Sequence, residues 1–240
     1  MSETAQTQPY DEFLFNATSH LLKPLSEILA SCDELSKNAD ENLDGMQKQL
    51  SRSISGNGHR MLDLLNDIRD YAEIQTGRIL IEKSPTDMTI LIKGVLDVAV
   101  WLTKNKPQIS IQHDIPTSLP ELSVQEMRIQ QVLINLIHNA VKFTDAGVIK
   151  ISVALNDHEI IFQVKDSGIG IAPEKFGLIF APFQTALADT VDARAGLGLG
   201  LPICKYIVKA HHGQIGFESM EGVGSTFSFS LPLEQTQGTA

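Results

Sequence analysis

The sequence lacks any apolar run long enough to cross a bilayer, although 42% of its 240 residues are hydrophobic. It also lacks basic character, because 29 acidic residues outnumber 19 lysines and arginines. This balance argues against a nucleic-acid surface, which depends on local positive charge. The polar start MSETAQTQPYDEF has no signal-peptide profile, so we expect a cytoplasmic chain without a membrane segment.

Cysteine is scarce as well. Cys32 and Cys204 each lie inside an apolar helical pattern, away from other types of metal ligand. We interpret both as small buried hydrophobic residues rather than as a metal or redox pair. Because the net charge is negative, an anionic small ligand needs local help from backbone amides, helix ends, a metal ion or isolated basic residues.

Two apolar stripes at helical spacing occupy the first third of the chain, and the polar segment LSKNADENLDG separates them. This pattern predicts a helical hairpin at 13–84, after a disordered or short helical lead-in at 1–12. One hairpin cannot bury all of these apolar faces, so we expect a homodimer in which two hairpins form a four-helix bundle. The stripes consist of Leu14, Ala17, Leu21, Leu25, Ile28, Cys32 and Leu35, and of Leu50, Ile54, Met61, Leu64, Leu65, Ile68, Ala72 and Ile74.

A second domain is predicted at 85–234, where IQTGRILIEKSPTD ends the helical pattern, with a disordered tail at 235–240. Helices separate its early strands, and its last strands are adjacent. The predicted fold class is therefore α+β, with the hairpin followed by an α/β sandwich whose mixed sheet is covered by helices. We expect helices at about 87–104, 123–143, 173–180 and 199–211, and strands at 109–115, 148–155, 159–166, 213–219 and 226–233.

Asn135 and Asn139 lie four residues apart in VLINLIHNAVKFT, and Lys142 follows one turn later. This spacing places the amides on one helix face, where they can offer oxygen to a metal ion or its waters while the ammonium group approaches phosphate. An exposed polar face of an amphipathic helix is the alternative interpretation of this motif alone. His138, between the asparagines, is expected on the helix surface.

Three glycine-containing turns follow. Asp166 ends the strand EIIFQVKD and leads into SGIGI, where its carboxylate can accept a hydrogen bond from an exocyclic amine. RAGLGLGLPI places glycines just before a helix, an arrangement suited to phosphate. GVGSTF, which contains Thr226, precedes the final strand. Each turn is weak evidence by itself.

In order and spacing, these pieces resemble the ATP-binding domain of sensor histidine kinases, a fold shared with gyrase, heat-shock-protein 90 and mismatch-repair ATPases. NLIHNAVKFT, DSGIG, FAPF and GLGLGL are similar to the family's asparagine, D-x-G-x-G, phenylalanine and glycine boxes over nearly all of 85–234. The resemblance implies ATP and Mg²⁺ as cofactors. It departs from the family at Leu197, where a small hydroxyl residue is common, and at Ala181, where an acid is common.

The resemblance also implies roles for individual residues. Asn139 would ligate Mg²⁺ with Asn135 nearby, Lys142 would contact phosphate, and Asp166 would hold the adenine amine. Phe180 and Phe183 would pack beneath the loop at 184–195, from which Arg194 would reach the terminal phosphate. The remaining candidates for the ATP site are Gly168, Gly170, Gly196, Gly198, Gly200 and Thr226. His211 and His212 end a helix, where a cation suits the dipole, and are assigned no chemistry.

The hairpin resembles the dimerisation and phosphoacceptor domain of the same kinases, whose first helix reads approximately F-L-A-N-V-S-H-E-L-R-T-P-L. Laid on FLFNATSHLLKPL without gaps, this pattern puts Ser19 at the acceptor and His20 at the following acid. The ungapped register keeps Leu21, Leu25 and Ile28 in the apolar stripe, so we favour Ser19 at the acceptor position, and both Ser19 and His20 remain catalytic candidates. Nothing marks His59 of the second helix as an acceptor.

The expected function is that of a Mg·ATP-binding core in two-component signalling. ATP would phosphorylate His20, and the phosphoryl group would pass to an aspartate of a response-regulator receiver domain. The acid after His20 is replaced by Leu21, so the alternative is a pseudo-histidine-kinase that acts as a regulatory dimeric binding module. Only about a dozen residues precede the hairpin, so we expect an excised core or a signal from an upstream sensor protein. A gyrase-like ATPase is disfavoured because the chain carries the hairpin and lacks a transducer domain.

Overall fold

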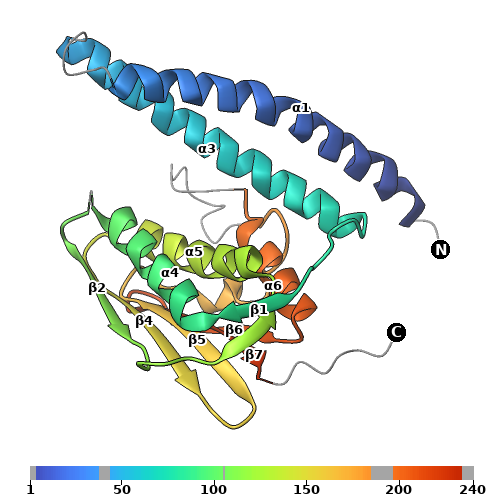
Figure 1. The fold of residues 1–240 in the computed structure, drawn as a ribbon, viewed down its shortest axis with the longest axis vertical. Coiled ribbons are helices and arrows are strands. Elements are labelled where there is room, and N and C mark those ends of the chain that lie inside the picture. Colours follow the sequence, from blue (N-terminus) through green and yellow to red (C-terminus); the bar gives the residue numbers. More distant parts are fainter. Residues whose placement is uncertain (1–3, 38–43, 105, 185–196, 234–240) are drawn as a thin grey trace. The chain divides into compact units, whose positions relative to one another are not determined.

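The structure, a computed structural model, describes residues 4–37, 44–104, 106–184 and 197–233. Two compact units make up the chain, Met1–Ile79 and Leu80–Ala240 (Figure 1). None of the helices within the described ranges combines the length and the apolar character needed to span a bilayer.

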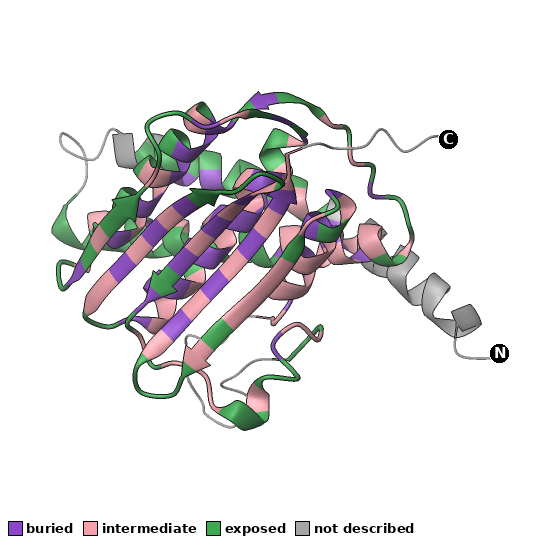
Figure 2. Ribbon diagram, turned by 90° about the horizontal axis from the view of Figure 1, so that it is seen from below, coloured by how far each residue is buried: buried purple, intermediate pink, exposed green. Residues whose placement is uncertain are grey.

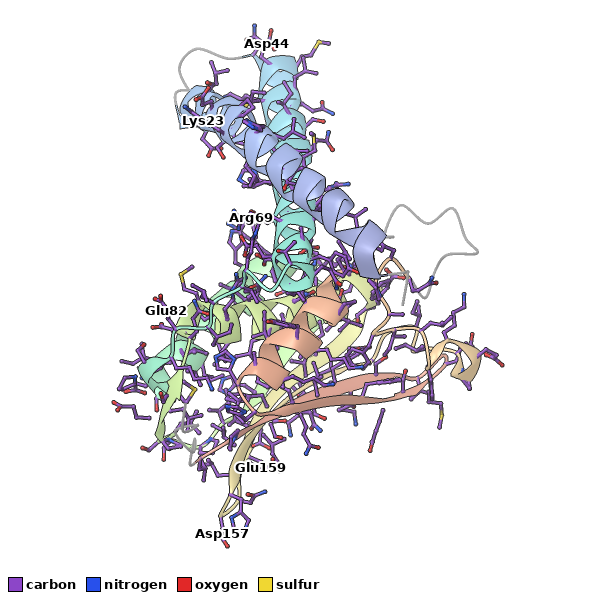
Figure 3. The ribbon with its side chains drawn as sticks, turned by 90° about the vertical axis from the view of Figure 1, so that its right-hand side faces the viewer. Lys23, Asp44, Arg69, Glu82, Asp157 and Glu159 are labelled. Carbon is purple, nitrogen blue, oxygen red and sulfur yellow. The ribbon has the colours of Figure 1, made fainter. Side chains whose placement is uncertain are left out.

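The first unit is a hairpin of two long helices, α1 (Thr4–Lys37) and α3 (Gly45–Gln75). Asp44 caps α3, and Figure 3 labels it at the start of this helix. The Asp44 carboxylate accepts a hydrogen bond from the Gln47 N–H at 2.8 Å, and the Gln47 side chain accepts one from the Asp44 N–H at 2.9 Å. This reciprocal capping box satisfies two backbone donors that a helix start leaves unpaired.

Leucines hold the two helices together. Leu25, Leu29 and Leu65 form the buried cluster, and Leu22 and Leu62 pack against it. Leu21 and Ile28, which the sequence analysis placed in one stripe with Leu25, stay about half exposed. Alternate apolar positions of α1 therefore point in two directions, one toward α3 and one toward solvent.

The second unit contains α4 (Met88–Thr103), α5 (Glu126–Phe143) and α6 (Gly200–Ala210). Its strands β2, β4, β5, β7 and β6 form a five-stranded sheet in that order; only the β2–β4 pair is parallel. The three helices lie on one side of this sheet (Figure 1). The strands span Ile109–Asp114 (β2), Gly147–Leu155 (β4), Glu159–Asp166 (β5), Gln214–Met220 (β6) and Gly224–Pro232 (β7).

Residues of the central strands alternate between the helix-covered face and the open face, and Figure 2 shows this alternation as bands of buried and less buried residues. Phe162 of β5 and Phe229 of β7 stack on the covered face with ring centroids 4.7 Å apart. The period of two follows from strand geometry, which points successive side chains to opposite faces. The mixed sheet with helices on one face agrees with the predicted fold class.

Two predicted elements differ from the structure. The helix expected from about residue 123 begins at Glu126, because residues 123 and 124 belong to a strand, β3 (Glu121–Val124), which pairs antiparallel with β1 (Ser84–Asp87), a strand far away in the sequence. The helix predicted at 173–180 is reduced to one 3₁₀ turn at Pro173–Lys175. Gly177 and Pro182 follow this turn closely, and both residue types disfavour helix continuation.

Candidate functional site

The asparagines of α5 lie beside the start of α6. A Cβ atom added to Gly200 would lie 2.5 Å from Nδ2 and 2.8 Å from Oδ1 of Asn135, so the Asn135 amide lies directly against the first residue of α6. Asn139 donates a hydrogen bond from Nδ2 to Asn135 Oδ1 at 3.4 Å. Within the described residues, no hydrogen bond involves Asn139 Oδ1. The asparagine motif and the glycine-rich turn, which are distant in sequence, therefore meet at one place.

Asp166 occupies the last position of β5 and is buried, with 7% of its surface exposed. Its Oδ1 atom accepts hydrogen bonds from the backbone N–H groups of Gly168 at 2.8 Å and Ser225 at 3.3 Å. Its Oδ2 atom accepts none within the part of the chain that the structure describes. Burial raises the pKa of Asp166, and the two backbone hydrogen bonds oppose that change.

The turn after Asp166 is tied to the end of α5. The Ile169 N–H donates to the Phe143 carbonyl at 3.2 Å, and a Cβ atom on Gly168 would collide with the same carbonyl oxygen. Gly170 has φ +67° and packs directly on the Met220 carbonyl, so two glycines of DSGIG are needed for close backbone contact. This attachment places Asp166 in the region of the C-terminal turns of the asparagine helix.

Thr226 does not lie with Asp166. It pairs with Lys165 across β5 and β7, so its side chain is on the open face of the sheet. Ser225 is on the covered face, and its Oγ atom lies 2.9 Å from Oγ of Ser219, which accepts a hydrogen bond from the Ile171 N–H at 2.9 Å. Ser225 rather than Thr226 therefore lies next to Asp166, to which its backbone N–H donates a hydrogen bond. Ser225 lies two residues before Phe227 and four before Phe229. This alternation along the strand identifies Ser225 as the residue that faces the covered side of the sheet.

Other candidates of this unit are placed as follows. Lys142 is half-buried in the last turn of α5, with its ammonium group 5.0 Å from the centroid of the Phe143 ring. Gly198 has φ +69° and packs on the Gln184 carbonyl. The residues that flank 185–196 are therefore in contact with each other. Arg194 and Gly196 lie outside the described residues.

The phenylalanine box packs in part on the sheet. Phe180 makes an edge contact with Phe217 of β6 at 6.1 Å, and the ammonium group of Lys205 lies 5.4 Å from the centroid of the Phe180 ring. Phe183 is 56% exposed and has φ +61°. The loop under which both were expected to pack is not among the described residues.

Family models match both units. Residues 124–235 match the histidine kinase-, DNA gyrase B- and HSP90-like ATPase family, and residues 11–77 match the His Kinase A (phospho-acceptor) domain. The solved catalytic domain of the histidine kinase ThkA is 31% identical, with a TM-score of 0.55, and the match covers 63% of this chain and 98% of that one. The chain belongs to the histidine kinases. It comprises an ATP-binding core of the two-component sensor kinase type.

Longer relatives match both units of this histidine kinase together. The circadian input-output histidine kinase CikA of Thermosynechococcus vestitus is 34% identical over 225 residues, which are 92% of this chain and 31% of that protein. Full-length ShkA, solved in complex with AMPPNP, is 27% identical with a TM-score of 0.73 over 94% of this chain and 46% of that one. The chain thus spans less than a third of the length of CikA and less than half of ShkA.

The histidines of the chain differ in exposure. His20 on α1 is exposed, and the next residue is Leu21 rather than an acid. Thr18 is buried, and the side chain of Ser19 lies outside the described residues. His138, on α5, is exposed as expected.

His211 is fully buried, which corrects the expectation of a cation at the end of α6. Its Nδ1 atom donates to the Ile207 carbonyl at 2.8 Å, and its Nε2 atom accepts a hydrogen bond from the Gln125 N–H at 3.0 Å. Burial lowers the pKa of His211, the Ile207 hydrogen bond opposes this, and the positive charges of Lys83 and His212 lower the pKa further. The neutral ring joins the end of α6 to the start of α5. In the sequence, a histidine at the end of an apolar helix does not distinguish a buried neutral ring from an exposed cation.

Proposed function

We propose that the second unit binds Mg·ATP with the adenine base against Asp166. The observation that carries this proposal is the buried Asp166 carboxylate, whose Oδ1 is held by two backbone N–H groups while Oδ2 has no partner among the described residues. A carboxylate oxygen accepts a hydrogen bond from the exocyclic amine of adenine but not from a carbonyl at the same position. Gly168 and Gly170 allow the adjacent backbone to approach a flat ligand closely.

The phosphate end of the site is proposed at the junction of α5 and α6. Asn139 Oδ1 has the chemistry of a Mg²⁺ ligand, and Lys142 and the backbone near Gly198 and Gly200 are suited to phosphate. Within the described ranges, no group of three or more His, Cys, Asp or Glu residues has the arrangement of a metal site. This donor set fits Mg²⁺, which keeps several waters and phosphate oxygens among its ligands. Bound Mg²⁺ would neutralise phosphate charge.

We propose that the hairpin forms a homodimer. Leu21, Ile28 and Leu35 recur every seven residues along α1 and are 51%, 52% and 54% exposed. Leu50, Ile54, Met61 and Leu64 form the matching exposed stripe of α3, and all four are at least 36% exposed. A seven-residue apolar repeat on paired helices is typical of a four-helix bundle, and a second hairpin supplies the missing half.

The reaction proposed for the complete dimer is phosphorylation of a hairpin histidine by ATP, followed by transfer to a receiver-domain aspartate in the cytoplasm. His20 is the candidate of the first helix because it is exposed. A regulatory module without phosphotransfer is the second candidate. The specific observation in its favour is Leu21, which replaces the acid that would orient an imidazole at position 20.

Calorimetry and radiolabelling distinguish these functions. Titration of the chain with Mg²⁺ and AMPPNP is expected to show saturable binding, and Asn139→Ala is expected to weaken binding much more with Mg²⁺ present than with EDTA. Incubation with γ-labelled ATP then gives acid-labile, alkali-stable label for a kinase and no label for a regulatory module. Absence of AMPPNP binding contradicts both candidates.

A further inference from the structure

The last turn of α5, which carries Lys142, ends without a glycine cap. Thr144, the residue that ends the helix, is extended, with φ −107° and ψ 121°, and Asp145 after it is not at positive φ either. A helix end leaves its last four carbonyl groups without partners inside the helix, and a residue at positive φ often helps to satisfy them. The carbonyl groups at this end of α5 therefore need hydrogen-bond donors from other parts of the chain.

Lys106 supplies such a donor from the connection between α4 and β2. Its ammonium group donates hydrogen bonds to the Val141 carbonyl at 2.6 Å and to the Thr144 carbonyl at 3.0 Å. Among the described residues, no carboxylate forms an ion pair with it. Hydrogen bonds from a charged donor are stronger than neutral ones, and a cation suits the negative end of the helix dipole. Lys106 therefore caps α5, although 35 residues separate it from Val141.

The backbone of Lys106 is itself fixed. Its N–H donates to the Thr103 carbonyl at 2.8 Å, and its carbonyl accepts a hydrogen bond from the Ile109 N–H at 2.9 Å. Pro107 follows, and its ring restricts the backbone on both sides. Strand β2, which begins at Ile109, pairs with β4 from Gly147 onward. Lys106 therefore reaches α5 from a fixed point at the start of an edge strand of the sheet.

These hydrogen bonds act on the residue that we propose to contact phosphate. The Val141 carbonyl belongs to the peptide group that joins Val141 to Lys142, so Lys106 holds the backbone directly before the Lys142 side chain. After that side chain, the Phe143 carbonyl accepts a hydrogen bond from the Ile169 N–H of the DSGIG turn at 3.2 Å. The backbone of Lys142 is therefore held between the Lys106 ammonium group and the DSGIG turn.

We propose that Lys106 is a positioning residue of the nucleotide site. By fixing the last turn of α5, it holds Lys142 in place relative to Asp166, so that one nucleotide reaches both side chains. A group that is held before the ligand arrives loses less freedom on binding. Lys106 acts through Lys142 rather than on the nucleotide, because its ammonium group is bonded to two carbonyl groups. The inference rests on the proposed Mg·ATP site and adds a residue outside the sequence motifs.

The test is a double-mutant cycle, measured by calorimetry on the full chain with Mg²⁺ and AMPPNP. Lys106→Met keeps the aliphatic stem without the ammonium group and is expected to weaken binding about tenfold, as is typical of residues coupled in one network. In a Lys142→Met background, the same substitution is expected to change affinity less than about twofold, because the residue through which Lys106 acts is absent. Equal losses in both backgrounds overturn the proposal, as does unchanged affinity of Lys106→Met alone. Failure of the unaltered chain to bind AMPPNP contradicts the proposed function itself.

Two controls separate positioning from a general loss of structure or charge. Adenosine has no phosphate groups, so Lys106→Met is expected to change adenosine affinity less than about twofold. Comparable losses for adenosine and AMPPNP overturn the proposal, because a loosened fold weakens both. Lys104→Met removes an exposed ammonium group two residues earlier and is expected to leave AMPPNP affinity unchanged. A loss equal to that of Lys106→Met would assign the effect to net charge and overturn the proposal as well.

Discussion

In the ATP-binding unit, Asp166 and His211 lie buried and take hydrogen bonds from backbone N–H groups, whereas in the hairpin Ile28 and Met61 lie about half exposed without a covering surface. In the ATP-binding unit, polar groups are buried in a packed interior. In the hairpin, apolar surface stays exposed and is available to a partner. Burial of polar groups is tolerated only where partners are supplied. We infer that the ATP-binding unit determines which ligand binds and that the hairpin mediates association with a second chain.

The largest expected effect concerns assembly. Ile28→Glu is expected to weaken the proposed dimer by at least about 1.5–3 kcal/mol, because each protomer loses burial of the exposed half of one isoleucine, worth about 0.8–1.5 kcal/mol, and places a charge in the interface. Sedimentation equilibrium should then show mostly monomer at concentrations where the wild type forms the proposed dimer. Lys23→Glu adds negative charge on the other side of α1 and serves as the matched control (Figure 3). A dimer unaffected by Ile28→Glu contradicts this assignment of the stripe.

The next effect separates binding from stability in the ATP-binding unit. Asp166→Asn is expected to reduce ATP affinity by about 1.5–3 kcal/mol, since it removes a charged hydrogen-bond acceptor. Its thermal stability is expected to stay equal or rise near neutral pH, because the raised pKa of Asp166 means that folding opposes ionisation of this group. Calorimetry and thermal denaturation measure the two quantities. Asp157→Asn, at the exposed β4–β5 turn, is the control (Figure 3).

A smaller effect depends on pH. Because the pKa of His211 is lowered in the folded state, the unfolded chain binds more protons below about pH 6.5, and stability falls as pH falls through that value. The slope from this residue reaches at most about 1.4 kcal/mol per pH unit. Denaturant unfolding of wild type and His211→Gln at several pH values measures it. Equal slopes in both proteins would refute a neutral buried His211.

The smallest effect compares two glycines of one helix. Gly56→Ala is expected to stabilise the hairpin by up to about 1 kcal/mol, because alanine favours a helix and the added methyl group meets open space. Gly58→Ala is expected to gain less or to destabilise, because the methyl group presses on Leu29. Chemical denaturation of the two variants gives the difference. The reverse order would contradict the packing of α1 on α3.

Most strands of the five-stranded sheet were predictable because they depend on local pattern, whereas the meeting of the motifs was expected from the family resemblance. Strand β5 was predicted at its observed bounds, since Ile160, Phe162 and Val164 alternate. Strand β3 was not, because its pairing with β1 is a long-range contact that local periodicity does not report. The burial of Ser225 and of His211 was missed for a related reason. Which polar group is buried depends on strand register and on a neighbouring helix end.

The most direct test of the nucleotide site compares ATP with inosine triphosphate by calorimetry in the presence of Mg²⁺. The two ligands differ at position 6 of the base, where ATP has an amine that donates and inosine triphosphate has a carbonyl that only accepts. With Asp166 as the acceptor, ATP is expected to bind at least about tenfold more tightly, and Asp166→Asn is expected to remove most of this difference. Equal affinity of the wild type for both ligands would contradict the account.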